Sequence, residues 1–569
     1  MLDKIYSRFN YQITLFLISL FFVFTSINLF YLSSEAPDYI FYKDYFDYFF
    51  REAPTTGREN GLLYFFLVSC VVKLQELNIT PATELHYISN SVNVVNILLY
   101  LIGLFGLLKL LIAKNFPKNN IFIAFSILNF MPFTIKLLST MKPEILAFAI
   151  LPWALFCIEM FLKSKNFSYI FWSIFPNILL LSTKNSIIAS VCAIYLFIVL
   201  SNFKIFYSKK FLKYVLIFLV FYSFILYEDY QSNGLFILNH IPEGGALFIQ
   251  EDNQVKLSFI YNINFPEIIQ KPYRHNHANS FIGIALLDLF GDYFQRYSNN
   301  TRSLYMFDNY VVKGFWYFGN VKELIGLFLG ILSYFFIFKY ISKYKATRFY
   351  LALPFFSFFV FLLNIFVNKD YFETSRASLF KSHYYSYLFV ITFAFLLVCF
   401  LKWRNILKYI FLILLVLSSI YLHGFFKTSY TNTLDYLSIK NNVSQFCNTN
   451  KLIFNIESSD GCHNYVQNLC SPNILLFDLR YLFNDSEIVH TNYPLELIND
   501  EGYIVKVNDI NSCLNYVENG FKYKSMYKNQ IKIPWVNIMF LVISIYSLYK
   551  VNKLFINEIN TKSHNIEYY

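Results

Sequence analysis

Charge is scarce in this sequence, and it is scarcest where a membrane carrier would need it. Charged residues make up only 15% of the 569 residues. No apolar run long enough to span a membrane has a carboxylate or lysine near its middle: Glu159, Lys109 and Lys136 lie toward the ends of such runs. Ion-coupled transporters usually need charges inside the membrane, so a carrier driven by protons or sodium is disfavoured. A P-loop is also missing, so ATP is not an obvious energy source.

Apolar and aromatic residues dominate instead, at 56% and 21% of the chain. Runs of about 17 to 22 apolar residues recur, and each could cross roughly 30 Å of hydrocarbon as a helix. We therefore expect an all-α polytopic membrane protein. The first run should be retained, because no small-residue cleavage site follows it. The expected spans are 13–32, 90–113, 120–137, 144–162, 168–182, 186–202, a helix ending near 227, 322–339, 349–367, 386–402, 408–424 and 534–550.

The net charge of +11 comes from basic residues that cluster in alternate loops. Placing these loops in the cytoplasm satisfies the positive-inside rule, so the charge indicates an orientation and not a nucleic-acid partner. The arrangement needs about twelve transmembrane helices and puts both termini in the cytoplasm. The loop residues that set the orientation are Lys4, Arg8, Lys114, Lys118, Lys163, Lys165, Lys204, Lys209, Lys210, Lys213, Lys339, Lys343, Lys345, Arg348, Lys402, Arg404, Lys408, Lys550 and Lys553.

This topology divides the chain into three parts. A transmembrane domain covers 1–424, an extracytoplasmic domain covers 425–532, and a last helix with a cytoplasmic tail covers 533–569. External loops at 33–89 and 228–320 interrupt the transmembrane domain. Because ordinary connections have only a few residues, we expect specificity to lie in these long external segments. Within the first loop, 38–50 and 62–74 are predicted to be juxtamembrane helices, since neither is long and apolar enough to span.

Four of the eight cysteines share the segment 425–532: Cys447, Cys462, Cys470 and Cys513. Two disulfides in an oxidising compartment fit this set, and three pairings are possible. A zinc site is the weaker reading, because no Cys-x-x-Cys pair is present. Short runs of alternating apolar and polar residues predict that this segment is a small α/β domain.

Carboxylates crowd the first external loop, directly after the first apolar run. Glu35, Asp38, Asp44 and Asp47 lie there among tyrosines. A partly desolvated carboxylate at a membrane surface can act as a general base on a hydroxyl or hold a divalent ion. The alternative is the solvated face of an interfacial helix. The functional reading is strongest for Asp38, which follows the first span closely, behind Pro37.

A second candidate is the short external turn Lys142-Pro143-Glu144 between two apolar runs. Its carboxylate could face the same cavity as the first loop, and its lysine could meet a phosphate. The other reading is structural: proline is preferred at the first helical residue, and Glu144 complements the positive end of a helix.

The loop at 228–320 adds Arg274, His277, Asp288 and Asp292 as candidates. The apolar stretch 281–290 should lie on the membrane with its polar end at the cavity. His275 and His277 could ligate a metal, although a surface or hydrogen-bonding role is the more ordinary reading.

Lys381 and Tyr385 precede the span at 386–402, on the side assigned to the exterior. A cation placed against the positive-inside trend usually has a partner, and an anionic lipid phosphate is a natural one. The alternative is an interfacial anchor made of lysine and tyrosine.

Taken together, the acidic first loop with juxtamembrane helices, the short external turns and the long loop before 320 resemble the GT-C superfamily of integral membrane glycosyltransferases. A terminal extracytoplasmic domain is common in that superfamily. The chain departs from it in lacking the frequent Asp-Glu pair of the first loop, and it lacks the Trp-Trp-Asp motif of oligosaccharyltransferases.

The resemblance implies an inverting hexosyl- or pentosyltransferase that moves a sugar from a polyprenyl-phosphate donor to a glycan, lipid or protein acceptor outside the membrane. Asp38 would activate the acceptor hydroxyl, with Glu35 and Asp47 in reserve and Glu144 as a further carboxylate. The residues implied for the lipid phosphate are Lys142, Arg274, Lys381 and Tyr385.

Two alternatives remain open. One is a polysaccharide polymerase of the O-antigen or exopolysaccharide type, to which Asp38-Tyr-x-x-Tyr and the segment 58–64 are loosely similar. The other is a flippase or exporter for lipid-linked sugars, which should bury cations along a central pathway. A divalent cation is a possible cofactor and no other is implied. Membrane lipids are expected partners, and a bacterial plasma membrane is the expected location.

Overall fold

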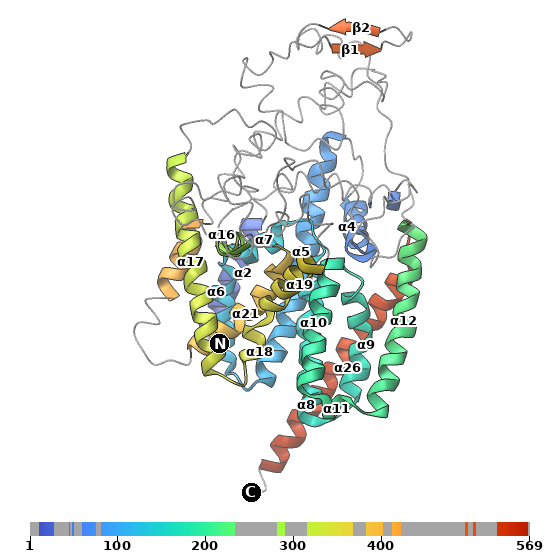
Figure 1. The fold of residues 1–569 in the computed structure, drawn as a ribbon, viewed down its shortest axis with the longest axis vertical. Helices are drawn as coiled ribbons and strands as arrows, with labels where there is room; N and C mark the ends of the chain where they lie inside the picture. Colours follow the sequence, from blue (N-terminus) through green and yellow to red (C-terminus); the bar gives the residue numbers. More distant parts are fainter. Residues whose placement is uncertain are drawn as a thin grey trace, which may run out of the picture.

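The computed structural model describes residues 11–27, 45, 48–50, 60–75, 81–233, 281–290, 316–367, 383–401, 412–422, 495–498, 504–507 and 532–566. Its long helices run side by side (Figure 1). The elements are α2 (Tyr11–Ile27), α4 (Leu62–Gln75), α5 (Pro81–Ala113), α6 (Lys118–Asn129), α7 (Pro132–Ser139), α8 (Glu144–Ser164), α9 (Ser168–Leu180), α10 (Asn185–Ser201), α11 (Phe203–Phe206), α12 (Lys209–Asn233), α16 (Phe281–Phe290), α17 (Trp316–Lys343), α18 (Arg348–Leu351), α19 (Leu353–Val367), α21 (His383–Leu401), β1 (Leu495–Ile498), β2 (Ile504–Val507) and α26 (Trp535–Ile566).

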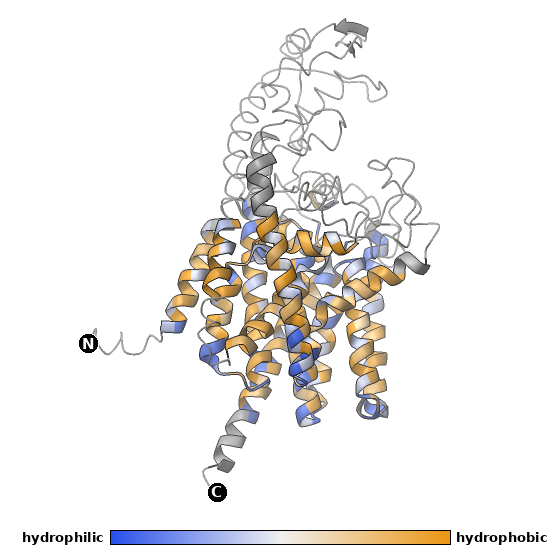
Figure 2. Cartoon of the chain, turned by 60° about the vertical axis from the view of Figure 1, so that its left-hand side comes forward, coloured by the Kyte–Doolittle hydropathy of each residue, from blue (hydrophilic) through white to orange (hydrophobic). Residues whose placement is uncertain are grey.

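The helices have the apolar surface of a membrane protein. Within the described residues, five are long and apolar enough to cross a membrane, or six if the bent pair α6 and α7 counts as one span. Seven further apolar helices have 10–17 residues. Figure 2 shows hydrophobic residues covering the helices along most of their length. Leu212, Leu216 and Leu219 of α12 are exposed, as expected for side chains that face lipid. The helical membrane protein is therefore supported, whereas the number of twelve spans stays a prediction.

Helix α8 forms the centre of the bundle. It packs against α5, α9 and α21, and 89% of its most apolar window is buried. Two glycines of α5, Gly103 and Gly106, let the helices approach: a Cβ atom at Gly103 would lie 2.6 Å from the Phe148 carbonyl oxygen, and one at Gly106 would meet the Trp153 ring. Next to Gly103, the Ile102 carbonyl accepts a hydrogen bond at 3.0 Å from the Trp153 indole. Small residues at such contacts are typical of helix pairs in membranes.

The predicted helix at 120–137 is two helices. Helices α6 and α7 meet at an angle of 70°, with Met131 in an extended conformation between them. Pro132 begins α7, and proline both lacks an N–H and disfavours a helical conformation at the residue before it. The apolar pattern continues across this break, so hydropathy alone missed it. The expected helix at 349–367 is likewise divided, into α18 and α19.

The segments predicted to be external are described only in part. Helix α4 occupies the predicted juxtamembrane stretch 62–74, and α16 occupies the apolar stretch 281–290. In the segment 425–532, the described residues include an antiparallel pair of strands, β1 and β2. The predicted α/β domain and its four cysteines otherwise lie outside the described residues. The described cysteines, Cys70, Cys157, Cys192 and Cys399, are free thiols.

Candidate functional site

A buried ion pair lies at the end of the bundle where α8 begins, which we call the Glu144 end. Lys184 Nζ lies 3.0 Å from Glu144 Oε1. The exposed fractions of the two side chains are 3% and 1%. Glu144 is the first residue of α8, and Lys184 directly precedes α10. Removing two charges from water is costly unless each has a partner, so this pair must be held firmly by its surroundings.

The second oxygen of Glu144 is available. Oε2 is buried, and no described residue donates a hydrogen bond to it. Buried polar atoms are nearly always hydrogen-bonded in native proteins, and an exception usually marks a strained, catalytic or ligand-binding group. With Oε1 held by Lys184, Oε2 is positioned to accept a hydrogen bond or a proton from a bound molecule.

The first turn, 140–143, is held by a chain of side-chain contacts. Asn96 of α5 donates through Nδ2 to the carbonyl oxygens of Leu138 at 2.7 Å and Thr140 at 2.9 Å. The Tyr64 hydroxyl of α4 donates to Asn96 Oδ1 at 2.9 Å. Pro143 then leads directly into α8. The position of Glu144 is therefore set by the juxtamembrane helix α4 as well as by α5.

The second turn, 182–184, is joined to residues 60–61 of the first loop. The Gly61 N–H donates to the Thr183 carbonyl at 2.8 Å, and Asn60 forms a β-bridge with Lys184. The Tyr45 hydroxyl donates to the Asn60 carbonyl at 2.7 Å. A Cβ atom at Gly61 would lie 1.8 Å from the Ser182 carbonyl oxygen, so only glycine fits this approach. The acidic segment 33–59 is therefore followed directly in sequence by Asn60, the residue that forms the bridge to Lys184.

Further polar atoms near these turns are buried without a hydrogen-bond partner among the described residues: Asn60 Oδ1, Ser139 Oγ and Ser186 Oγ. The three residues belong to the segments that carry or flank Glu144 and Lys184. Similar atoms occur elsewhere, such as Gln12 Oε1 and Ser544 Oγ, so these three support a site for water or a polar ligand only together with Glu144 Oε2.

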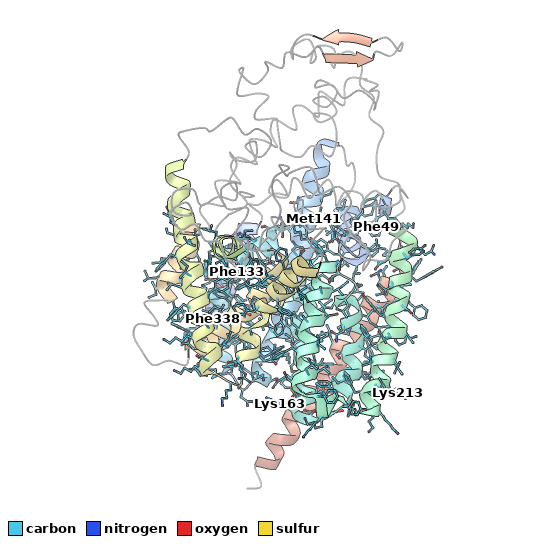
Figure 3. All side chains as sticks on the ribbon, in the orientation of Figure 1. Phe49, Phe133, Met141, Lys163, Lys213 and Phe338 are labelled. Carbon is cyan, nitrogen blue, oxygen red and sulfur yellow. The ribbon has the colours of Figure 1, made fainter. Side chains whose placement is uncertain are left out.

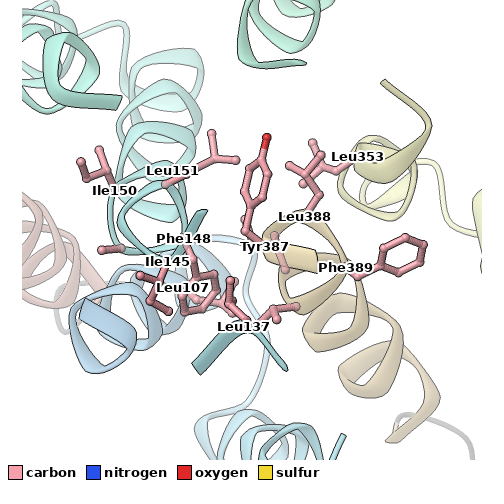
Figure 4. Close-up of a cluster of buried hydrophobic side chains, with 14 of the residues drawn as sticks. Leu107, Leu137, Ile145, Phe148, Ile150, Leu151, Leu353, Tyr387, Leu388 and Phe389 are labelled. Carbon is pink, nitrogen blue, oxygen red and sulfur yellow. The ribbon is translucent and has the colours of Figure 1, made fainter. Parts of the chain in front are cut away.

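The sequence predicted two residues of this turn, and the structure places both. Glu144 and Lys142 are buried in the same turn. Tyr385, predicted to contact a lipid phosphate, is buried on α21, where its ring centroid lies 5.0 Å from that of Phe358. On the same helix, Tyr387 lies between Leu151 of α8 and Leu353 of α19 (Figure 4). The roles assigned to Lys142, Glu144 and Tyr385 stay predictions.

The other predicted site residues lie outside the described residues. These are Glu35, Asp38, Asp47, Arg274, His277, Asp292 and Lys381. Asp288 belongs to α16, but its side chain also lies outside the described part. The described residues contain no group of three or more His, Cys, Asp or Glu that could hold a metal ion. Whether the site takes a divalent cation is therefore still only a prediction.

Lys184 was not among the predicted site residues. A signal for it exists: it is a lysine in a short turn that the topology assigns to the exterior. This is the same departure from the positive-inside trend that drew attention to Lys381. Its partner lies 40 residues away in sequence, so local spacing could not reveal the pair.

The opposite end of α8 carries a second buried carboxylate, Glu159, and gives a useful contrast. Lys114 Nζ lies 2.7 Å from Glu159 Oε2, and Lys163 Nζ lies 3.7 Å from Oε1. The Tyr350 hydroxyl also donates to Oε2, at 3.0 Å. Both oxygens of Glu159 therefore have protein partners, as expected of a structural ion pair. Glu144 differs in keeping one oxygen available.

The chain matches no protein-family model, and neither a curated protein nor a solved structure matches it. The geometry of the Glu144 end is therefore the basis for any functional assignment.

Proposed function

We propose that the chain is a membrane glycosyltransferase that moves a sugar from a polyprenyl-phosphate donor to an acceptor hydroxyl at the Glu144 end of the bundle. The main support for this proposal is the carboxylate of Glu144: Lys184 holds its Oε1, while its buried Oε2 has no hydrogen-bond partner among the described residues. A buried acceptor atom of this kind suits a site that must bind a hydroxyl group in a defined orientation.

The connection between the two turns and the first loop supports the choice of reaction. Asn60 and Gly61 attach that loop to the turn that carries Lys184. The first loop holds Asp38, the carboxylate that the GT-C resemblance implies as general base. In the proposed reaction Asp38 takes the proton of the acceptor hydroxyl, and the oxygen of that hydroxyl attacks the anomeric carbon of the sugar. The bond from that carbon to the phosphate oxygen breaks, and the polyprenyl phosphate leaves with the electron pair.

Glu144 acts in this scheme as a binding group. Its Oε2 accepts a hydrogen bond from a sugar or acceptor hydroxyl, and its charge is balanced by Lys184. Lys142, buried in the same turn, is proposed to face the departing phosphate, together with Arg274, Lys381 and Tyr385. A lysine suits this role because it presents a compact positive charge to phosphate oxygens.

A flippase for lipid-linked sugars is less well supported. Residues 145–158 of α8 contain no charged side chain, and its two buried carboxylates lie roughly 22 Å apart along the helix axis at 1.5 Å per residue. A pathway for a charged headgroup would need polar groups between these ends. The charges gather at the ends of α8, as a surface-acting transferase requires.

The test is transfer of a labelled sugar from polyprenyl-phosphate donors to membrane acceptors, using the purified full-length chain. Asp38→Asn should lower the rate by about 10²- to 10⁴-fold, the usual contribution of a general base. Glu144→Gln should lower it by at least about tenfold, equivalent to ~1.4 kcal/mol of transition-state stabilisation.

Glu159→Gln is the matched control, because it changes a buried, ion-paired carboxylate of the same helix at the other end. It should leave transfer within about twofold of the wild type once the amount of folded protein is equalised. Unchanged transfer in Asp38→Asn would remove Asp38 from catalysis. A wild-type chain that uses no lipid-phosphate donor would overturn the proposal as a whole.

A further inference from the structure

A cavity of about 170 Å³ lies between α9, α10 and α12, apart from the site at Glu144. Its wall is mainly apolar and includes Ile174, Ile198, Phe206, Phe211, Val215 and Phe218. The volume is similar to that of a dry apolar cavity of about 150 Å³ that binds benzene. The cavity is therefore large enough for a short stretch of a hydrocarbon chain.

The polar side chains of the wall satisfy one another. The Tyr195 hydroxyl donates a hydrogen bond to Asn177 Oδ1. Asn177 Nδ2 donates to the Ser173 carbonyl at 2.9 Å, and the Ser173 hydroxyl donates to the Ile170 carbonyl at 2.8 Å. Because these groups already have partners, the wall attracts an apolar chain more than water or a polar ligand.

Four lysines lie beside this cavity in sequence and structure. Phe206, Phe211 and Tyr214 line its wall, and they alternate along the chain with Lys204, Lys209, Lys210 and Lys213, which are exposed. Lys210 Nζ lies 5.9 Å from the centre of the Phe167 ring, so this lysine is directed back toward α9. An apolar cavity beside a basic turn has the two features that an anionic lipid needs.

The neighbouring surface is one that lipid chains can reach. Leu196 and Leu200 of α10 and Leu212 and Leu216 of α12 are exposed apolar residues. The basic turn lies at the end of the bundle opposite Met141 and Phe49, as the position of Lys213 in Figure 3 shows. The cavity therefore lies at the end away from the lipid-linked donor that is proposed for the Glu144 end.

We propose that this cavity is a binding site for an anionic phospholipid of the surrounding membrane. One acyl chain occupies the cavity, and the phosphate lies at the basic turn formed by Lys204, Lys209, Lys210 and Lys213. The proposal does not depend on the enzymatic function, because it uses none of the residues of the Glu144 end.

The test uses the full-length chain reconstituted in an equimolar mixture of phosphatidylglycerol and phosphatidylcholine, followed by native mass spectrometry of the lipids that stay bound. The wild type should retain phosphatidylglycerol in preference to phosphatidylcholine. Lys210→Gln should reduce this preference about fivefold, and removal of further lysines should reduce it by a similar factor each.

Val215→Trp fills the cavity and should abolish retention of the lipid. Leu216→Trp, at the next position on the exposed surface of the same helix, is the matched control and should retain lipid as the wild type does. Elution of each variant as a monodisperse species by size-exclusion chromatography shows that it is folded. Equal retention by Val215→Trp and the wild type, or an unchanged preference after all four lysines are replaced by Gln, would refute the site.

Discussion

The ion pair between Glu144 and Lys184 is stabilising only as a pair. Each side chain is almost completely buried, so loss of either one leaves the other charge in a region of low polarity. Removing one partner of such a pair commonly costs about 3–5 kcal/mol, whereas replacing both by apolar residues is often nearly neutral. This asymmetry separates a structural role of the pair from a functional one.

We expect Lys184→Met alone to lower the unfolding free energy by about 3–5 kcal/mol, because Glu144 then remains buried without its cation. The double variant Glu144→Leu, Lys184→Met should recover most of that stability. The measurement is the midpoint of unfolding in mixed detergent micelles. If the recovered double variant also transferred sugar at the wild-type rate, the pair would be structural only.

Gly61 lies too close to the turn at Ser182 to carry a side chain. The position where a Cβ atom would stand is 1.8 Å from the Ser182 carbonyl oxygen, and neither a Cβ atom nor a backbone oxygen can rotate away from this contact. Gly61→Ala should therefore separate the first loop from the turn of Lys184 and lower the unfolding midpoint.

Asn60→Ala is the control for this change, since Asn60 takes part in the bridge through its backbone and its side-chain Oδ1 has no described partner. Hydrogen exchange measures the effect directly. The Gly61 amide, which donates to Thr183, should exchange like the wild type in Asn60→Ala. In Gly61→Ala the amide of residue 61 should exchange faster, and protection equal to the wild type would show that the turn tolerates a side chain.

Part of this site, the turn with Glu144, could be predicted from the sequence. Lys142-Pro-Glu144 places charges between two long apolar runs, and such a turn is conspicuous in one dimension. Lys184 also lies in a short turn between apolar runs, but its role in the site depends on Glu144, which is 40 residues away in sequence. The two turns that carry Glu144 and Lys184 are held by α4, α5 and the loop at Asn60 together. No local pattern encodes that combination.

At the level of elements, the breaks at Met131 and Ala352 were missed, but elsewhere the middle of a described helix was easier to predict than its ends. Helix α8, expected at 144–162, runs from Glu144 to Ser164, because a continuous apolar run and Pro143 mark its start. Helix α5 is longer than expected, since its first turns continue beyond the apolar stretch that begins at Asn90. Hydropathy shows which part of a helix suits the bilayer, whereas backbone hydrogen bonds can continue the helix beyond that apolar part.

The contact between α5 and α8 depends on Gly103. Gly103→Leu should lower the unfolding free energy by about 1–3 kcal/mol, the usual cost of overpacking, because Phe148 and its carbonyl oxygen occupy the space that a side chain would need. Unfolding in mixed micelles measures the loss. Val94→Leu places the same side chain at an exposed position of α5 and should change stability little. Equal effects of the two substitutions would show that α5 and α8 do not pack through Gly103.

Across the whole molecule, the predicted alternation of loops agrees with the described bundle in one respect. Lys163 and Lys213, assigned to the cytoplasmic side, lie at the same end, opposite Met141 and Phe49 (Figure 3). Lys114 joins them through Glu159. The basic turns are therefore grouped at one end, which is the pattern that the positive-inside rule produces.

The orientation of this bundle determines which compartment supplies the proposed substrates. Lys532 marks the Glu144 end, because it is exposed and its N–H donates to the Phe49 carbonyl at 2.9 Å. Lys213 marks the opposite end. In a chain whose native cysteines are replaced by serine, we expect Lys532→Cys to react with a membrane-impermeant maleimide on intact cells. Lys213→Cys should react only after the membrane is permeabilised, because the positive-inside rule predicts that the basic end lies in the cytoplasm.

The cysteine-free chain gives the background for both measurements. The reverse pattern, with Lys213→Cys labelled on intact cells, would place Glu144 and Lys184 on the cytoplasmic side. The polyprenyl-phosphate donor would then have to present its sugar inside the cell, and an extracytoplasmic transfer reaction would be ruled out. Because the labelling requires no substrate, it tests the orientation independently of the chemistry proposed for the site.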